Sequence, residues 1–329
     1  MSERGCTVAG MTQTASESSF ADGAAFIDGA FVPIAEARVP ILDWGFLRSD
    51  ATYDVVSVWN GHFFRLDAHI ERFDKGLEVL QLSCGLGRAQ LEGVLAECVE
   101  LAGLENAYVE FICTRGQPKW GSRDPRDCEN AFYAFAVPYV WIATPEKQET
   151  EGLHLVISPI ERISPSSVDP SVKNYHWLDF QRGLLDAFER GGETVVLAGP
   201  DGTVTEGPGF NLFAVQDGAV ITPASGVLEG ITRRTAIEIA QGFGLEVKRA
   251  PLTVDAVRGA EELFGTSTAG GILPMTRLDG EPLAGGRPGE LTMRIRERYW
   301  ELHEDPAYTR SVAAISRSEL AVDAARRAV

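Results

Sequence analysis

Lysine is scarce in this chain, and positive charge is in deficit. Of the 329 residues, 30 are Lys or Arg and 47 are Asp or Glu, which gives a formal net charge of -17. Nucleic acids and anionic membranes attract clustered Lys and Arg, so this balance argues against both as partners. Five of the basic residues are lysines, namely Lys75, Lys119, Lys147, Lys173 and Lys248.

Cysteine and histidine are also few. The five cysteines are odd in number and form no C-x-x-C pair, so we expect neither a disulfide framework nor a zinc site. A reducing, cytoplasmic location is the simplest interpretation. The five histidines are scattered, which argues against a metal centre. The cysteines are Cys6, Cys84, Cys98, Cys113 and Cys128.

No apolar run is long enough to span a membrane. Residues 1–20 are rich in Ser and Thr and have no apolar core flanked by basic residues, so we interpret them as a flexible arm and not as a signal peptide. The hydrophobic content of 44% and the charged content of 23% are those of an ordinary globular protein. The length suits one large domain or two of medium size.

Turn signals and helical periods predict a mixed α/β (α+β) fold. Asn-Gly or Asp-Gly pairs between apolar runs are typical of β-hairpins. Apolar residues recur at helical spacing in 67–82, 88–102, 174–190, 232–243 and 289–303. Hairpins mixed with helices indicate mixed sheets. The hairpin signals are Asp28-Gly29, Asn60-Gly61, Asp201-Gly202, Asp217-Gly218 and Asp279-Gly280.

A stretch with prolines and a glycine around charged residues predicts a boundary between two domains. It extends over 138–152, with Pro138, Pro145 and Gly152. We therefore expect a flexible arm over 1–20, a small N-terminal α/β domain over 21–140, a linker over 141–152, and a large C-terminal domain over 153–329.

Glu206 is an acid in an apolar setting. It lies in Thr205-Glu206-Gly207-Pro208-Gly209-Phe210, directly ahead of the apolar run that continues to Phe213. A buried carboxylate is costly unless a cation meets it. The segment predicts a buried acid with a cationic partner, although a glycine-rich turn is the simpler alternative.

Three segments are candidates for binding an anion. Gly230 precedes the helical period that contains Ile231 and Thr232, and a helix start offers free N–H groups, although a capped helix explains the pattern equally well. Hydroxyls and glycines in 265–271 are typical of an anion-binding turn. Arg72 lies on an amphipathic helix, where a solvated or salt-bridged arginine is the ordinary interpretation.

Among the five lysines, Lys173 has the sequence context that is least typical of a solvent-exposed side chain. It precedes Asn174-Tyr175-His176-Trp177 at the start of a helical period, whereas Lys75, Lys119 and Lys147 lie in charged or polar surroundings and Lys248 on the outward face of a strand-like segment. Arginine stays protonated, so a nucleophilic amine has to come from a desolvated lysine. We therefore select Lys173 as the candidate catalytic lysine.

Taken together and in this order, these segments resemble the class IV aminotransferases, the fold type IV group of enzymes that use pyridoxal 5'-phosphate (PLP). The group includes branched-chain aminotransferases, D-amino-acid transaminases, aminodeoxychorismate lyases and (R)-selective amine transaminases. The resemblance covers residues from about 25 to 303 and rests on Arg72, Lys173-Asn174-Tyr175, Glu206-Gly207, Gly230-Ile231-Thr232 and Ser267-Thr268-Ala269-Gly270.

The resemblance implies roles for these residues. Lys173 would form a Schiff base with PLP and carry a proton between the substrate carbon and the cofactor. Glu206 would pair with the pyridine nitrogen and keep it protonated. The phosphate would be held by Arg72, the Ile231 and Thr232 amides and Thr268, with Ser267 also in the cofactor site. It also implies a homodimer of two-domain subunits, with PLP bound between the domains.

Departures from the family pattern indicate the substrate class. Branched-chain enzymes have a Tyr-x-Arg strand whose arginine holds the substrate carboxylate, whereas this chain has Tyr108-Val109-Glu110. The Arg-x-His clamp of D-amino-acid transaminases is missing after Thr114-Arg115-Gly116. The segments 48–57 and 169–177 resemble the (R)-selective amine transaminases most, which implies a primary amine, (R)-configured, as donor and a keto acid such as pyruvate as acceptor.

That subgroup implies a substrate pocket, whose residues would be Arg48, Tyr53, Val55, Tyr108, Arg123 and Ala269. Arg123 would be a mobile contact for the acceptor carboxylate, although an ordinary loop arginine explains it equally well. Tyr53 and Tyr108 could instead be core aromatics. Branched-chain or D-amino-acid transamination, an aminodeoxychorismate-type lyase, and a homologue that binds PLP without catalysis remain the alternatives.

Overall fold

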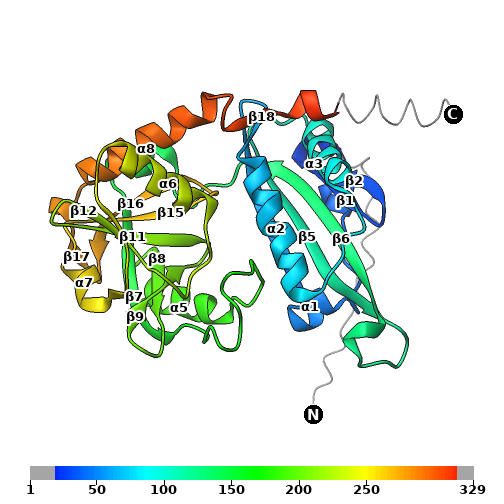
Figure 1. The fold of residues 1–329 in the computed structure, drawn as a ribbon, viewed down its shortest axis with the longest axis horizontal. Helices are drawn as coiled ribbons and strands as arrows, with labels where there is room; N and C mark the ends of the chain where they lie inside the picture. Colours follow the sequence, from blue (N-terminus) through cyan, green and yellow to red (C-terminus); the bar gives the residue numbers. More distant parts are fainter. Residues whose placement is uncertain (1–18, 317–329) are drawn as a thin grey trace, which may run out of the picture.

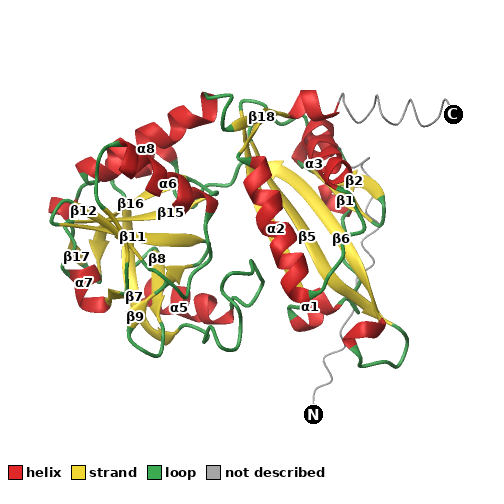
Figure 2. Ribbon diagram, in the orientation of Figure 1, coloured by secondary structure: helices red, strands yellow, loops and turns green. Residues whose placement is uncertain are grey.

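The computed structural model describes residues 19–316, and the arm expected over 1–20 lies mostly outside this range. Two sheets, each with its own helices, lie side by side (Figure 1). Helices, strands and loops alternate through both halves (Figure 2). This arrangement is the mixed α/β fold that the sequence predicts.

Among residues 19–316 the first sheet has seven strands and is antiparallel throughout. Its strands in spatial order are β18 (Thr309–Ser311), β4 (His62–Phe64), β3 (Ala51–Trp59), β5 (Ala107–Pro118), β6 (Cys128–Pro138), β1 (Ala24–Ile27) and β2 (Ala30–Pro33). β18 comes from the end of the described chain. The C-terminal segment therefore returns to the sheet of the N-terminal half.

Two amphipathic helices cover one face of this sheet, α2 (Leu66–Leu80) and α3 (Arg88–Ala102) (Figure 1). Their apolar side chains, such as Phe73 and Leu95, pack with Val56, Val109 and Phe111 in one buried core. Because side chains alternate along a strand, the odd-numbered residues of β3 face away from this core. Both faces of β3 are nevertheless buried, so its other face also has a protein neighbour.

The second sheet, in the part of the chain that the structure describes, has eleven strands and mixes parallel with antiparallel pairs. Strands β7 (Leu153–Glu161), β8 (Thr194–Ala198), β11 (Phe210–Gln216), β15 (Glu262–Ser267) and β16 (Gly271–Leu278) form its centre. The remaining strands are β9 (Thr203–Val204), β10 (Glu206–Gly207), β12 (Ala219–Thr222), β13 (Val247–Arg249), β14 (Leu252–Thr253) and β17 (Glu281–Pro282).

Helices α6 (Ile231–Gly242) and α8 (Glu290–Glu301) pack on one side of this second sheet, against Phe213 and Phe264. Helix α5 (Leu178–Glu189) packs against Val195 and Leu197 in a separate cluster. The short helices are α1 (Trp44–Arg48), α4 (Pro145–Thr150) and α7 (Val254–Arg258).

All five hairpin signals form turns between consecutive strands. At Asp28, Asn60, Asp217 and Asp279 the Asx residue itself has a positive φ, near 50°, and a glycine with positive φ follows it. This pairing is the reason Asx-Gly is favoured there. Helix α4, whose N-cap is Thr144, lies within the stretch expected as a linker. The domain boundaries expected from the sequence stay a prediction.

Candidate active site

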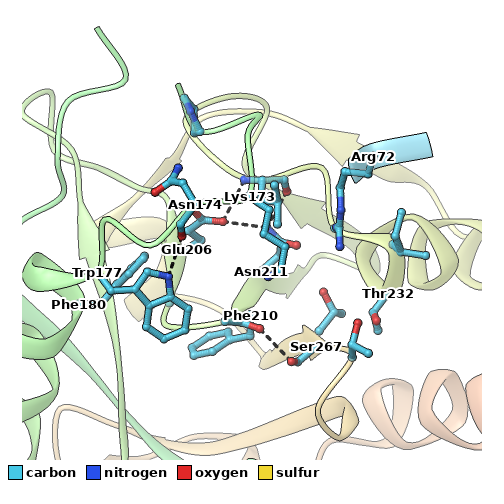
Figure 3. Close-up of a pocket in the computed structure, with 18 of the residues that line it drawn as sticks. Arg72, Lys173, Asn174, Trp177, Phe180, Glu206, Phe210, Asn211, Thr232 and Ser267 are labelled. Atoms are coloured by element: carbon cyan, nitrogen blue, oxygen red, sulfur yellow. Dashed lines mark hydrogen bonds between the residues drawn. The ribbon is translucent and has the colours of Figure 1, made fainter. Parts of the chain in front are cut away.

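A cleft lies between the two halves of the molecule, with about 640 Å³ of space outside the protein atoms. Its wall comes from β3 and α2 of the first half and from several loops and strands of the second (Figure 3). Eight of the residues selected from the sequence line it: Tyr53, Arg72, Lys173, Glu206, Ile231, Thr232, Ser267 and Thr268.

Lys173 is held by the free edge of β3. Its carbonyl oxygen accepts hydrogen bonds from the Tyr53 amide (3.1 Å) and the Thr52 hydroxyl (3.0 Å). Its amine lies 4.5 Å from the centre of the Tyr53 ring. Burial, and next the charge of Arg72, lower the pKa of Lys173 from 10.5 to about 8. A lysine with this pKa has an appreciable neutral fraction near pH 8.

The helix expected over 174–190 begins later than the periodicity predicts, at Leu178. The Lys173 carbonyl is engaged by β3 and does not start a helical ladder. The Asn174 side chain meanwhile accepts a hydrogen bond from the His176 amide (2.9 Å), which stabilises a turn. Lys173 therefore lies on an extended segment and not at the start of a helix.

Glu206 lies in the short strand β10, directly ahead of a two-residue turn. Strands β10 and β11 pair Glu206 with Asn211 and Gly207 with Phe210. The turn between them is Pro208-Gly209, and Gly209 has φ 79°, which is the pattern of a type II turn. The glycines that surround the acid in the sequence therefore serve to bring it into the cleft.

The Glu206 carboxylate is buried, and Arg162 is a protein cation that meets it, while its expected pairing with the cofactor stays a prediction. It accepts hydrogen bonds from the Leu228 amide (3.0 Å) and the Asn211 side chain (3.3 Å). Arg162 lies 3.4 Å from its other oxygen. Burial raises the pKa of Glu206, and the Leu228 amide and the charges of Arg162 and Lys173 oppose this rise. Further positive charge in the cleft would stabilise its ionised form.

The opposite side of the cleft can bind an anion. Helix α6 begins after Gly230, and no side chain of the described residues caps it, so its first amides are available to a ligand. A Cβ on Gly230 would lie 2.1 Å from Asn211 Oδ1, which explains the glycine at this position. Arg72 donates to the Glu229 carbonyl (3.2 Å) and lies on the same side as Thr232 (Figure 3).

The loop after β15 contributes hydroxyl groups. Thr266 Oγ1 is buried, lines the cleft and has no hydrogen-bond partner among residues 19–316. A buried unpaired hydroxyl costs about 1–3 kcal/mol, so a ligand or water that accepts from it would recover that loss. The Ser267 hydroxyl donates to the Gly209 carbonyl (2.8 Å), which braces the loop against the turn after Glu206.

A cluster of tyrosines around a buried acid lies next to Lys173. The rings of Tyr53 and Tyr175 stack with centroids 4.2 Å apart. The Tyr175 and Tyr108 hydroxyls donate to Glu110, at 2.5 Å and 3.2 Å. Burial raises the pKa of Glu110, whereas the Tyr175 hydrogen bond and the charge of Lys173 lower it. The Glu110 carboxylate is thus placed to discriminate, by charge, among substrates that bind next to Lys173.

The other residues selected for the substrate pocket do not line the cleft. Val55 and Tyr108 lie on the sheet face that holds Tyr53 and Glu110, because Val55 pairs with Glu110 and Ser57 with Tyr108. Arg48 stacks on Trp44, with its guanidinium carbon 3.3 Å from the ring centre, and lines a different hollow.

Two further selected residues lie in loops. Arg123 is exposed on the loop between β5 and β6, which projects from the far end of the first sheet (Figure 1). The Ala269 carbonyl accepts from the Ile142 amide (3.0 Å). The substrate roles of these five residues stay predictions.

Among the residues of the site that were not selected from the sequence are Arg162, Tyr175 as a partner of Glu110, and Thr266. Arg162 also pairs with Asp179 (2.7 Å) and lies 4.1 Å from the centre of the Phe180 ring. A lone arginine after a strand gives no signal that it faces an acid 44 residues later. The unusual acid in Tyr108-Val109-Glu110 was the sequence feature that could have indicated the tyrosine cluster around Glu110.

Solved structures that are similar to this chain include branched-chain aminotransferases. The branched-chain amino acid aminotransferase of T.th., complexed with N-(5'-phosphopyridoxyl)-L-glutamate, superimposes with a TM-score of 0.81 at 26% identity, over 88% of this chain and 99% of that one. The branched-chain aminotransferase of Thermoproteus uzoniensis with norvaline gives a TM-score of 0.80 at 26% identity with the same coverage.

Sequence relatives agree with the structural ones. The D-alanine aminotransferase of Staphylococcus aureus is 28% identical over 292 residues, 84% of this chain and 98% of its own. The branched-chain-amino-acid aminotransferase of Pseudomonas aeruginosa is 25% identical over 288 residues, 85% of this chain and 93% of its own.

The chain belongs to the amino-transferase class IV family, whose model matches residues 51–278. It is a PLP-dependent aminotransferase with the fold type IV architecture. The predictions of fold, enzyme class and cofactor are therefore confirmed. No helix among the described residues is long and apolar enough to cross a membrane.

Proposed function

We propose that this aminotransferase moves an amino group from a primary amine, (R)-configured, to a keto acid such as pyruvate. The observation that carries the proposal is the buried Glu110 carboxylate beside Lys173, at the strand position where branched-chain enzymes of the resembled family hold the donor carboxylate with an arginine. The (R) configuration rests on the resemblance of segments 48–57 and 169–177.

Electrostatics favour a donor without a carboxylate. Glu110 is 9% exposed, so its charge is weakly screened. Its hydrogen-bond partners are the hydroxyls of Tyr175 and Tyr108, and the nearby cation that opposes its raised pKa is Lys173. The carboxylate of an amino acid bound on this face would meet a second carboxylate, which is repulsive. A simple amine avoids this repulsion.

The residues around the cleft fit PLP. Bound PLP supplies an electron-accepting ring that carries the amino group between the two substrates. Lys173 would bind the aldehyde carbon and then move the proton at the donor carbon, and Glu206 would hold the proton on the ring nitrogen. Arg72, the first amides of α6 and Thr268 would hold the phosphate, and the unpaired Thr266 hydroxyl is available to a ligand oxygen in the same cleft.

Capture of PLP by the apoenzyme should depend on pH with a midpoint near 8. The reactive form of Lys173 is the neutral amine, and burial together with Arg72 lowers its pKa to about 8. The uptake rate should therefore be half-maximal near pH 8 and level off about one pH unit above this midpoint. The rate is followed by the visible absorbance of enzyme-linked PLP in stopped flow.

Nα-acetyl-lysine is the control for the pH profile, because an unperturbed lysine amine has a pKa of about 10.4. Its reaction with PLP should keep accelerating through pH 9 and 10. An enzyme profile that rises in parallel with this control to pH 10 would show that the cleft does not lower the pKa of Lys173.

Transamination of branched-chain or D-amino acids is the second candidate, because relatives 25% and 28% identical carry those names. A donor screen separates the two. It compares both enantiomers of 1-phenylethylamine, D- and L-alanine and L-leucine, each with pyruvate and with 2-oxoglutarate as acceptor. Fast turnover of L-leucine with none of the (R)-amine would refute the proposal. Pyruvate release from aminodeoxychorismate, without a keto-acid acceptor, would instead indicate a lyase.

Glu110→Gln should shift donor preference toward amino acids. Removal of the charge relieves the repulsion of a donor carboxylate, so kcat/KM for alanine or leucine should rise by about tenfold. The kcat/KM for 1-phenylethylamine, which has no carboxylate, should change by much less. The readout is the ratio of the two values in the variant and in the unmodified enzyme.

Glu92→Gln is the matched control, because Glu92 is also 9% exposed but lies on α3, where it pairs with Arg88 and Arg310 and not with the groups around Lys173. It should leave the ratio of the kcat/KM values for the amino acid and for 1-phenylethylamine unchanged. A ratio unaffected by Glu110→Gln, or moved equally by Glu92→Gln, would remove the basis for the amine preference.

A homodimer is proposed from an exposed apolar segment that leads into α1. Ile41 is 74% exposed and Phe46 70% exposed, and Val39, Leu42 and Leu47 are exposed beside them. Contiguous apolar exposure of this kind is typical of an interface. A monomer in sedimentation velocity would contradict the proposal. A cytoplasmic location stays a prediction.

A further inference from the structure

The carboxylate of Asp54 is fully buried behind Arg72, outside the lining of the cleft. It accepts two hydrogen bonds from Arg72, from Nε at 2.7 Å and from Nη2 at 2.8 Å. His69 Nδ1 lies 2.7 Å from the same carboxylate, and the Val55 amide donates to it. Burial alone would raise the pKa of Asp54, but Arg72 and His69 hold it well below its usual range.

His69 is the second group that orients Asp54. Burial lowers the pKa of His69, so its neutral form, with the hydrogen on Nδ1, matches the ionised acid. The side chains of Asp54, His69 and Arg72 therefore form a hydrogen-bonded network between β3 and α2, centred on the buried Asp54 carboxylate. Such a network leaves its members little freedom to move.

A count of the N–H groups of Arg72 shows what remains for a ligand. A guanidinium has five N–H groups. Two go to Asp54, and one on Nη1 goes to the Glu229 carbonyl. Within residues 19–316 this leaves one N–H on each terminal nitrogen, next to the start of α6. Two N–H groups on one guanidinium can bind two oxygens of a phosphate.

We propose that Asp54 is a positioning residue for the cofactor phosphate. It fixes the guanidinium of Arg72 so that its two remaining N–H groups face the anion site at the start of α6. The inference rests on the proposed phosphate-binding role of Arg72. It extends that role to an acid that does not touch the phosphate itself.

Positioning and bulk electrostatics predict opposite results for Asp54→Asn. The substitution removes a negative charge near the anion site, so electrostatics alone would tighten PLP binding. Loss of the fixed guanidinium should instead weaken it, by about tenfold to a hundredfold. Binding of pyridoxal, which has no phosphate, should change little. The experiment titrates apoenzyme with PLP and with pyridoxal by absorbance.

Asp50→Asn is the matched control, because the Asp50 carboxylate also accepts two hydrogen bonds from one arginine. The donors are Nε and Nη2 of Arg115, at 3.0 Å and 3.1 Å, and the pair lies outside the cleft. It should leave both affinities unchanged. In an Arg72→Gln background, Asp54→Asn should have no further effect on PLP affinity. Unfolding of each apoenzyme is followed separately to record loss of stability.

Tighter or unchanged PLP binding in Asp54→Asn, or an equal loss of PLP and pyridoxal, would overturn the positioning role. If Asp54→Asn does not fold, Asp54→Glu keeps the charge but displaces the guanidinium, and it must show the same phosphate-dependent loss. If Arg72→Gln alone leaves PLP affinity intact, the proposed phosphate site is wrong. If Arg72→Gln weakens PLP and Asp54→Asn does not, the role of Asp54 alone is wrong.

Discussion

Lys173→Ala should abolish the visible absorbance of enzyme-linked PLP and lower turnover by at least about 10⁴-fold. The effect is large because one group has two tasks, covalent attachment of the cofactor and proton transfer at the donor carbon. Lys173 is half-buried, its amine lies over the Tyr53 ring and its pKa is lowered. The absorbance spectrum and the kcat of the purified variant measure both effects.

Lys75→Ala is the control for this substitution, because Lys75 is exposed on α2, the helix that carries Arg72. It should keep the spectrum and the turnover of the unmodified enzyme. A Lys173→Ala variant that retained the spectrum or substantial turnover would mean that another lysine holds the cofactor.

Glu206→Gln should leave PLP bound but lower kcat by about 10²–10³-fold. The glutamine side chain can keep a hydrogen bond to the Leu228 amide through its oxygen, so the shape of the site is retained. It lacks the charge that holds a proton on the ring nitrogen. The bound ring then accepts electrons less readily, and proton abstraction slows.

Glu262→Gln is the comparison for the loss of a carboxylate that accepts backbone hydrogen bonds. Glu262 receives the Leu291 and Thr292 amides at the start of α8, outside the cleft. It should affect stability more than kcat. If turnover of Glu206→Gln equals that of the unmodified enzyme, Glu206 has no role at the ring nitrogen.

Local signals predicted the fold well because they depend on few residues. Each Asx-Gly pair forms a turn, because its glycine, and in four of the five pairs the Asx residue too, adopts a positive φ that these residue types reach more readily than others. Helices expected over 88–102 and 232–243 are observed as Arg88–Ala102 and Ile231–Gly242. The return of β18 to the first sheet was not predicted, because a strand of three residues has no sequence pattern that identifies β4 as its pairing partner.

The candidate site was predicted where a motif lies within one short segment. Glu206, Gly230-Ile231-Thr232 and Ser267-Thr268 each come with their own turn, so sequence order and spacing suffice. Groups that face one another only after folding were missed. Arg162 and Glu206, or Glu110 and Tyr175, are 44 and 65 residues apart and meet through the packing of separate elements.

The helix start near Lys173 shows the same limit. The apolar period over 174–190 is real, but the Lys173 carbonyl bonds to β3, which belongs to the other half of the molecule. A long-range contact thus overrides a local preference and keeps the lysine on an extended segment. The same contact brings the amine to Tyr53.

The account depends most on Lys173 as the lysine that holds PLP. Borohydride reduction of the holoenzyme fixes the cofactor to its lysine, and peptide mass analysis then locates it. We predict the phosphopyridoxyl group on the peptide that contains Lys173, and none on peptides with the other four lysines. The label on Lys75, Lys119, Lys147 or Lys248 would contradict the account.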